Sequence, residues 1–141
     1  MPDSRPLDQR NHQVQQLPPG AAQLLAGPHT GVLTTVRRDG SPHLAPVRFS
    51  WDDDSGLVRV MTTESRAKIR NILAHPDLPV GICQTVQFRW ITLEGRATVS
   101  SEPGRLAEGV RRYIRRYASP PPELPGLVVV EIAVERVMGI W

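Results

Sequence analysis

A series of short β-rich runs, separated by turn residues, limits what this chain can fold into more than any other feature. The runs 31–36 and 41–49 flank Asp39-Gly40, a pair typical of hairpin turns. Short antiparallel strands expose unpaired edges unless the sheet closes, so the pattern favours a small barrel of about six to seven strands. The other predicted strands cover residues 57–62, 80–86, 88–100, 127–134 and 136–141.

Helical patterns interrupt the strands at two or three places. A short helix is predicted over residues 21–26, a second over 65–74 and a third over about 103–118. The expected fold class is therefore mainly β, within the α+β group. Gly95 lies in the middle of the longest β-rich run, where it predicts a β-bulge or a close approach of two backbones.

The chain length of 141 residues suits one domain, which we expect over residues 21–141. Residues 1–20 are polar and rich in Gln and Pro, and are predicted to form a flexible N-terminal arm. They lack the apolar stretch of a secretory signal, and no run approaches the roughly 20 apolar residues of a membrane span. The single cysteine, Cys83, fits a reducing compartment and is predicted to be inert packing. We therefore expect a cytoplasmic protein without a membrane partner.

The net charge of +3 is compatible with nucleic acid or with an anionic cofactor. Aromatic residues make up only 5% of the chain and do not alternate with basic ones, so we expect no nucleic-acid partner. We also expect no metal site, because His12, His29 and His75 are dispersed and only one cysteine is present. The acidic run 52–54 lacks the spacing of a calcium loop and is interpreted as a solvated turn.

The segment 61–71 is the strongest functional signal, because a predicted strand there leads into a helix whose first turn is cationic. Backbone N–H groups and the helix dipole already make this end of a helix electropositive, so Arg66 and Lys68 cost stability unless an anion offsets them. Hydroxyl groups of Thr62, Thr63 and Ser65 add donors at the same corner. The segment therefore predicts a site for a phosphorylated ligand, although a solvated helix start remains the alternative.

Three motifs in order along the chain resemble one superfamily, the pyridoxamine-phosphate-oxidase-like flavin and deazaflavin split β-barrel proteins. They are the run 62–71, the hairpin around Asp39-Gly40 and the segment 90–97. The likeness covers about residues 21–141. The segment 89–97, together with the tyrosines and arginines of 112–117, is most similar to the enzymes that use coenzyme F420, in particular the F420-dependent biliverdin reductase branch.

The resemblance implies an FMN-binding-like split barrel that works as a homodimer with its site at the subunit interface. The family's Ser-Arg-x-Lys corner holds the cofactor phosphate, and the strand after the first hairpin lies along the cofactor ring. Trp90 becomes a candidate wall contributed by the partner subunit. The residues that this assigns to the phosphate are Thr62, Thr63, Ser65, Arg66, Lys68 and Asn71, and those that it assigns to the ring are His43, Leu44, Ala45, Pro46 and Val47.

The implied activity is an F420-dependent oxidoreductase that transfers hydride from the reduced deazaflavin to a conjugated acceptor, such as biliverdin or a quinone. An FMN-binding oxidoreductase and a non-catalytic cofactor or haem carrier remain the alternatives. The chain shows no clear match to the C-terminal segment with which pyridoxamine phosphate oxidases hold pyridoxal, and this argues against vitamin B6 oxidation. No catalytic residue is identified; His43 is a weak candidate for a proton donor, since unperturbed imidazole titrates near neutrality.

The predicted helix 103–118 carries five arginines away from its apolar face. They either form a solvated polar face or meet the acidic oligoglutamate tail that F420 has and FMN lacks. The five are Arg105, Arg111, Arg112, Arg115 and Arg116.

Overall fold

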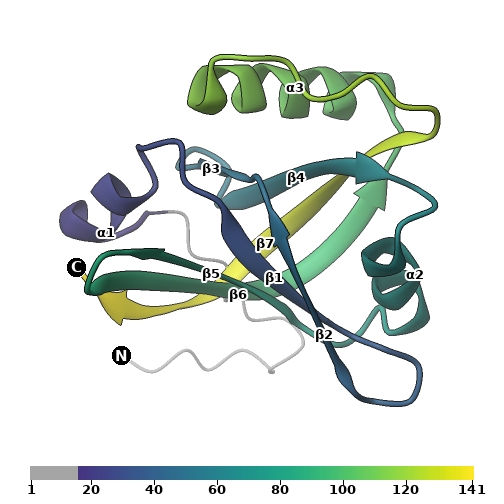
Figure 1. Cartoon of the computed structure of the whole chain (residues 1–141), viewed down its shortest axis with the longest axis horizontal. Helices are drawn as coiled ribbons and strands as arrows, with labels where there is room; N and C mark the ends of the chain where they lie inside the picture. Colours follow the sequence, from purple (N-terminus) through teal and green to yellow (C-terminus); the bar gives the residue numbers. More distant parts are fainter. Residues whose placement is uncertain (1–15) are drawn as a thin grey trace, which may run out of the picture.

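A computed structural model describes residues 16–141 of the protein, and within them seven strands form one antiparallel sheet accompanied by three helices (Figure 1). The order of the strands in the sheet is β2-β1-β5-β6-β7-β4-β3. The helices are α1 (Pro19–Leu24), α2 (Ala67–Ala74) and α3 (Pro103–Tyr117). The strands are β1 (Gly31–Val36), β2 (Pro42–Val47), β3 (Ser50–Asp52), β4 (Leu57–Thr63), β5 (Val80–Val86), β6 (Arg89–Ser100) and β7 (Leu127–Ile140).

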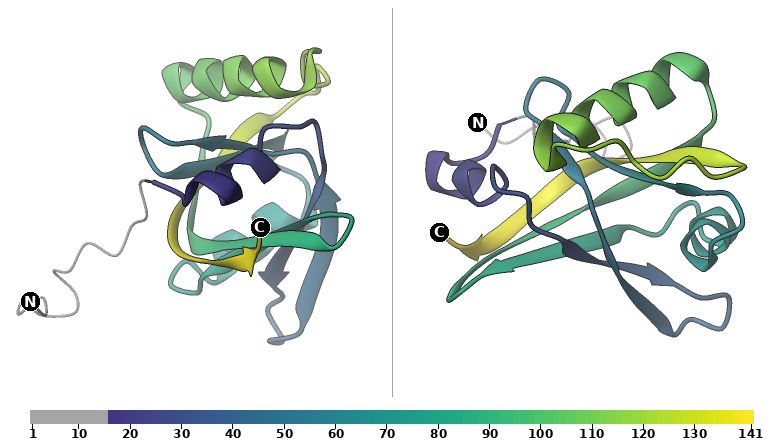
Figure 2. Two further views of the ribbon diagram at one scale, coloured as in Figure 1. Left: turned by 90° about the vertical axis from the view of Figure 1, so that its left-hand side faces the viewer. Right: turned by 45° about the horizontal axis from the view of Figure 1, so that its top comes forward.

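The sheet is strongly twisted and wraps around the core, as the two turned views in Figure 2 show. The long strands β6 and β7 pass through the middle of the sheet, with β1, β2 and β5 on one side of them and β3 and β4 on the other. Helix α3 lies across the β3–β4 side, while α1 and α2 lie at opposite ends of the sheet (Figure 1). The prediction of a mainly β split barrel with six to seven antiparallel strands and two or three helices is confirmed.

The core is filled by the inward-facing residues of the strands and closed at both ends by helices. Leu33, Phe49 and Ile91 are almost completely buried at its centre. Leu24 of α1 and Ile69 of α2 are buried at the two ends. Because helices this short are only marginally stable by themselves, the burial of these apolar side chains stabilises them. Residues 1–15, His12 among them, lie outside the described residues, and the flexible arm therefore stays a prediction.

The backbone irregularity expected at Gly95 is present. The pairing of β6 with β7 shifts register between Glu94 and Gly95, which is a β-bulge. A Cβ atom on Gly95 would lie 2.0 Å from the backbone oxygen of Ala133, so only glycine fits there. On the opposite strand the chain continues without a break, and the prediction of separate strands over 127–134 and 136–141 is wrong, because the bulge absorbs the irregularity inside one strand, β7.

The acidic run 52–54 is also different from its prediction. Asp52 ends β3, a three-residue strand that the sequence pattern missed, and its side chain is buried with 4% exposure. Its carboxylate pairs with Arg59 of β4 at 2.8 Å and with Arg112 of α3 at 3.2 Å. The solvated turn therefore begins one residue later, because two distant arginines draw Asp52 into the protein.

Candidate functional site

A cavity of about 360 Å³ lies where the end of β2, the end of β4 and the start of α2 meet the segment that follows α3. The C-terminal ends of β2 and β4 supply two of its walls, and the proline-rich segment between α3 and β7 supplies a third. The first turn of α2 brings two cations to it. The lining residues are Pro46, Val47, Arg48, Val60, Met61, Thr62, Thr63, Arg66, Lys68, Pro121, Pro122, Leu124 and Leu127.

The chain reaches the cationic corner by a sharp change of backbone direction. Strand β4 ends at Thr63, and Arg66 then takes an extended conformation as the N-cap of α2, with no side chain capping the helix. The first N–H groups of the helix therefore lack the oxygen that a capping Ser, Thr or Asp would give them. The Thr63 and Ser65 hydroxyl oxygens lie 3.4 Å apart beside this turn. Together these groups form a set of donors for an anion.

Within the described part of the chain, no acidic group balances the charge of this corner. Among residues 16–141, no carboxylate forms an ion pair with Arg66 or Lys68. Burial lowers the pKa of the Lys68 ammonium group below its usual value, and the neighbouring charge of Arg66 lowers it further. A dianionic phosphate would offset both charges and accept hydrogen bonds from the hydroxyls, so the donor set fits a phosphorylated cofactor.

The lining is poor in groups that could act as acids, bases or nucleophiles. Apart from Arg48, Arg66, Lys68 and two threonines, the side chains that line the cavity are apolar, and no Asp, Glu, His, Cys or Tyr is among them. The site is therefore built to bind and orient a molecule that carries its own reacting atom.

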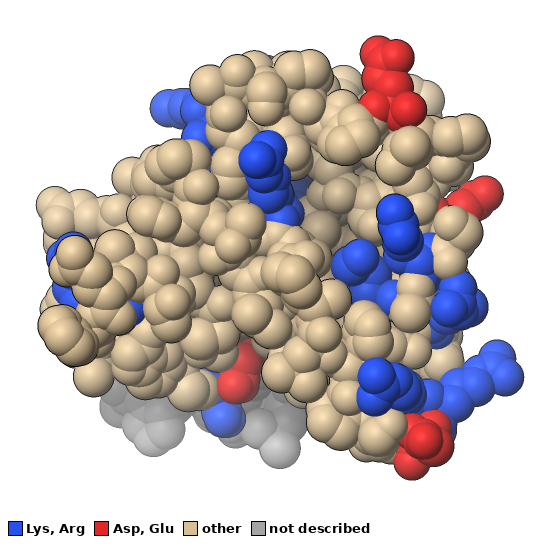
Figure 3. Space-filling view, viewed as in Figure 1, with Lys and Arg blue, Asp and Glu red and all other residues tan. Residues whose placement is uncertain are grey.

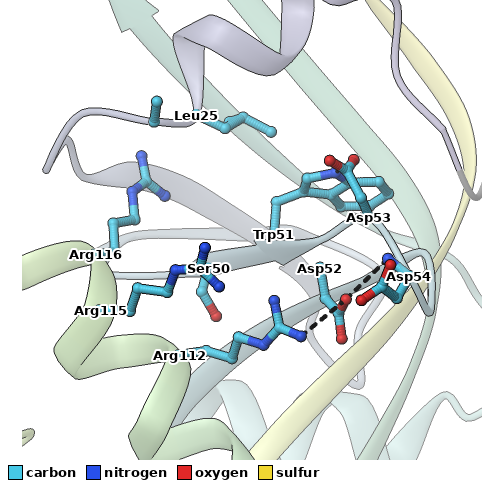
Figure 4. Close-up of a pocket in the computed structure, with 10 residues that line it drawn as sticks. Leu25, Ser50, Trp51, Asp52, Asp53, Asp54, Arg112, Arg115 and Arg116 are labelled. Carbon is cyan, nitrogen blue, oxygen red and sulfur yellow. Dashed lines mark hydrogen bonds and ion pairs between the residues drawn. The ribbon is translucent and has the colours of Figure 1, made fainter.

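A second cavity, of about 440 Å³, lies between α1, β3 and the C-terminal half of α3 (Figure 4). Two of its three cations, Arg112 and Arg116, are already engaged. Burial alone would raise the pKa of Asp52, but hydrogen bonds from Arg59 and Ser55 and the charge of Arg112 lower it to about 2. Arg112 also pairs with Glu108 at 2.8 Å. This cavity therefore offers an anion little unpaired positive charge.

Arg116 is held more firmly than any other arginine of α3. Its guanidinium donates to the backbone oxygen of Gly27 at 2.9 Å, to that of Phe49 at 2.6 Å and to Gln84 Oε1 at 2.6 Å. Its charge also lies over the Phe49 ring, 4.4 Å from the ring centroid. Of the five α3 arginines, four pair with groups of the protein itself, and Arg115 is the one without a partner among the described residues. The idea that these arginines meet an acidic cofactor tail is therefore not supported for those four.

Comparison with known proteins places this geometry in a family. The profile of the pyridoxamine 5′-phosphate oxidase family matches residues 17–140. The chain belongs to this family. It is 39% identical over 119 residues to the F420H2-dependent biliverdin reductase of Mycobacterium tuberculosis, an alignment that covers 84% of this chain and 85% of that protein.

Solved structures agree with the family assignment. A structure of an F420 reductase is similar with a TM-score of 0.68 and 26% identity, covering 86% of this chain and 98% of the other. General stress protein 26 from Bacillus anthracis is similar with a TM-score of 0.65 and 26% identity, covering 84% and 89% of the two chains.

Six of the residues that the family resemblance assigned to the cofactor do line the first cavity. The ring candidates Pro46 and Val47 lie there, and the phosphate candidates there are Thr62, Thr63, Arg66 and Lys68. Ser65 does not line the cavity but lies beside Thr63.

The other assigned residues lie elsewhere in the single chain. Asn71 Nδ2 donates to the Thr35 hydroxyl at 3.0 Å and faces the β1 side of α2. His43, Leu44 and Ala45 lie further along β2 from the cavity, and the Leu44 side chain is 61% exposed. The buried Nδ1 of His43 has no hydrogen-bond partner among the described residues. This position does not favour His43 as a proton donor to a ligand in the cavity.

Trp90 also lies away from the cavity of its own chain. It pairs with Thr85 of β5 and Ile140 of β7 in the backbone ladder. Trp90 therefore contributes to a site of this kind only if it comes from a partner subunit.

Sequence reasoning missed the proline-rich wall of the cavity and the cation at its other end. Pro121 and Pro122 lie just beyond the predicted helix 103–118 and carried no functional signal, although the chain folds them back over β4. Arg48 follows β2 directly, and its guanidinium donates to the Tyr113 hydroxyl at 3.0 Å and lies over the Tyr117 ring. Its position one residue after the predicted ring residues 43–47 was the available signal.

Proposed function

We propose that the protein is an F420-dependent reductase whose cofactor occupies the cavity between β2, β4 and α2. The observation that carries this proposal is the unbalanced cationic corner of Arg66 and Lys68 in a chain 39% identical to an F420H2-dependent biliverdin reductase. The F420 reductase among the similar structures adds support. Because the corner is built for a phosphate, it would accept FMN as well, and the choice of F420 rests on the relatives.

In this proposal Arg66 and Lys68 hold the phosphate, with Thr62 and Thr63 donating hydrogen bonds to its oxygens. The apolar surface of Pro46 and Val47 supports the flat ring. When bound, the reduced deazaflavin supplies the hydride that the acceptor receives. The protein's own contribution is to position the ring, to exclude water with its apolar walls and to compensate the phosphate charge.

The acceptor is proposed to be a conjugated organic molecule, with biliverdin first and a quinone second. Pro121, Pro122 and Leu124 present an apolar surface on the open side of the cavity, where a flat acceptor can stack over the ring. No His, Asp, Glu, Cys or Tyr is among the described residues that line the cavity, so the accompanying proton is proposed to come from water.

The active form is proposed to be a homodimer with the site at the subunit interface. Alternation along β6 places Trp90 on the same outer face of the sheet as Thr92, which lines an apolar outer cavity together with Val32 and Cys83. The exposed Val32 and Leu44 lie on the neighbouring strands β1 and β2. Pairing of two such faces would bury these side chains and carry Trp90 of the partner subunit toward the cavity.

The dimer is tested by sedimentation of the wild-type protein and of Leu44→Asp. The wild type is expected to sediment as a dimer and Leu44→Asp as a folded monomer with weaker cofactor binding. A monomeric wild type that still binds cofactor tightly would refute the interface site.

The function is tested by titrating the protein with F420 and FMN under identical conditions, and then by following oxidation of reduced F420 in the presence of biliverdin or a quinone. Tighter binding of F420 and acceptor-dependent oxidation are expected. Preferential binding of FMN would point to a flavin enzyme, and binding without turnover to a cofactor carrier.

No helix of residues 16–141 is long and apolar enough to cross a membrane, and a cytoplasmic location is part of the proposal.

A further inference from the structure

Arg48 is a cation of the proposed cofactor cavity that lies apart from the phosphate corner. Most basic side chains on this face of the molecule gather on the side where α2 and the β1–β2 hairpin lie (Figure 3). The members of this α2 cluster are Arg37, Arg38, Arg66, Lys68 and Arg70. Arg48 also lines the cavity, but its guanidinium lies against α3. The cavity therefore has a second cationic point beside its α3 wall.

Two tyrosines of α3 hold the Arg48 guanidinium in place. Its Nη1 donates to the Tyr113 hydroxyl at 3.0 Å, and its Cζ lies 5.0 Å from the centroid of the Tyr117 ring. Tyr113 is buried. The Tyr117 hydroxyl donates to the backbone oxygen of His29 at 2.7 Å and accepts from the backbone N–H of Phe49 at 3.0 Å. Both rings are therefore fixed, and they present the cation to the cavity in one orientation.

The aromatic rings orient Arg48 without neutralising it. Among residues 16–141, no carboxylate forms an ion pair with Arg48, and only one of its guanidinium N–H groups has a hydrogen-bond partner. Arg116 shares the Tyr117 ring, with its Cζ 5.3 Å from the same centroid, and is fixed by three hydrogen bonds. Two like charges near one ring repel each other. An anion beside Arg48 would offset this repulsion and accept from its remaining N–H groups.

The neighbours of Arg48 in the cavity are the residues that the proposed function gives to the ring and the acceptor. Arg48 follows Val47, which supports the ring in that proposal, and it shares the cavity with the apolar wall of Pro121 and Pro122. An acceptor stacked between the ring and this wall would reach Arg48 with a side chain on its edge. The cofactor phosphate is matched by the α2 cations, so the anion that suits Arg48 belongs to the acceptor.

We propose that Arg48 binds a carboxylate side chain of the acceptor and thereby selects carboxylate-bearing conjugated molecules over neutral ones. The inference rests on the proposed function and adds a specificity-determining residue to it. A planar guanidinium can donate two parallel hydrogen bonds to a carboxylate, and the α3 tyrosines fix the position of that plane. Biliverdin carries propionate side chains and meets this requirement, whereas an unsubstituted quinone does not.

The experiment compares biliverdin with its dimethyl ester, which keeps the conjugated system but has no carboxylate. The dissociation constants of both are measured by absorption titration of the full chain saturated with oxidised F420, and kcat/KM is measured with reduced F420. The variants are Arg48→Gln, Arg48→Lys and Tyr113→Phe. The matched control is Arg115→Gln, because it removes an exposed arginine of α3 that does not line the cofactor cavity.

The wild type is expected to bind biliverdin about tenfold more tightly than the ester, an effect between that of an exposed ion pair and that of a buried one. Arg48→Gln should remove this difference by weakening biliverdin alone, with the dissociation constant of F420 unchanged. Arg48→Lys should restore only part of it, since an ammonium group lacks the planar fork. The values of kcat/KM should change in the same ratio as the affinities.

The positioning role of Tyr113 gives a smaller effect. Tyr113→Phe keeps the ring but removes the hydroxyl that orients Arg48, so biliverdin should bind about two- to threefold more weakly and the ester as before. Arg115→Gln should change the binding of neither acceptor.

Two results would overturn the inference while leaving the proposed function intact. One is equal binding and reduction of biliverdin and its ester by the wild type. The other is an equal loss of both acceptors, or a loss of F420 itself, in Arg48→Gln, which would assign this arginine to the cofactor or to the fold. Failure of the wild type to bind F420 would overturn the inference and the proposed function together.

Discussion

The two arginine-rich regions of this protein use the same residue for opposite purposes. On α3 the guanidinium groups are partners in a network that ties the helix to the sheet, with Arg112 on Asp52 and Arg105 on Glu131. Around α2 the cations form no ion pair among the described residues, although Lys68 is half-buried. The number of arginines in a helix thus says little about ligand binding, whereas the presence or absence of an acidic partner says much.

The comparison predicts first that the α3 arginines matter for stability. Arg116→Ala is expected to lower the free energy of unfolding by about 3 kcal/mol, because it removes three hydrogen bonds and leaves the buried Gln84 Oε1 without its donor. The measurement is urea unfolding, with the neighbouring Arg115→Ala as control, which should change stability by no more than about 0.5 kcal/mol. If both variants lost only a little free energy of unfolding, the α3 arginines would not stabilise the fold, and the proposed difference from the α2 region would be contradicted.

The α2 cations are expected to matter for binding instead. Lys68→Ala should weaken cofactor binding by about 1.5–3 kcal/mol, since it removes one charge-assisted contact to the phosphate. The fold should not suffer, because the lowered pKa of Lys68 shows that its charge opposes folding. Cofactor titration and thermal unfolding of the same variant check both statements, and unchanged affinity would mean that the phosphate binds elsewhere.

Acid should act on the α3 network through Asp52. Its pKa in the folded protein is about 2, below the ordinary 3.8, so its stabilising contribution is complete above pH about 4 and is lost as the pH falls toward 2. The difference corresponds to about 2 kcal/mol. Urea unfolding at pH 4 and pH 2 should show a larger loss for the wild type than for Asp52→Asn, and equal losses would contradict the network.

Salt is expected to give the smallest effect and to act on the α2 region alone. The α2 cations are mainly exposed, so added salt screens their attraction for an anionic ligand, whereas the buried pair of Arg59 and Asp52 is screened much less. Raising the salt concentration should weaken cofactor binding several-fold and leave the urea midpoint nearly unchanged. A midpoint that shifts as much as the affinity would argue that both regions are solvated alike.

Local pattern was enough to predict most of the fold. Alternation, the Asp-Gly turn and helix-ending prolines located β1, β2, β4, β5, β6 and all three helices, and Gly95 located the bulge. Strand β3 escaped because it has only three residues and its last one, Asp52, is an acid. An isolated acidic run favours a turn, and the burial of Asp52 depends on the arginines at positions 59 and 112 as well as on the local hydrogen bond from Ser55.

The same limit applies to the site. The cationic turn at Arg66 and Lys68 could be recognised because its groups are adjacent in sequence. The proline wall could not, since Pro121 and Pro122 reach the cavity only after the chain has crossed α3 and turned back. The sequence also could not show which α3 arginines are paired, because a partner can lie far along the chain. The acidic partner of Arg105, for example, lies 26 residues away on β7.

Helix α2 joins two tasks within eight residues, since its first turn faces the proposed phosphate site while Ile69 and Ile72 close one end of the core. An anion bound at that turn would stabilise the helix and, through Ile69 and Ile72, the end of the core that the helix closes. Amide hydrogens of β1 and β6, which α2 covers, should then exchange with solvent more slowly once cofactor is bound. Cofactor binding would thus slow the hydrogen exchange of backbone amides that do not contact the ligand.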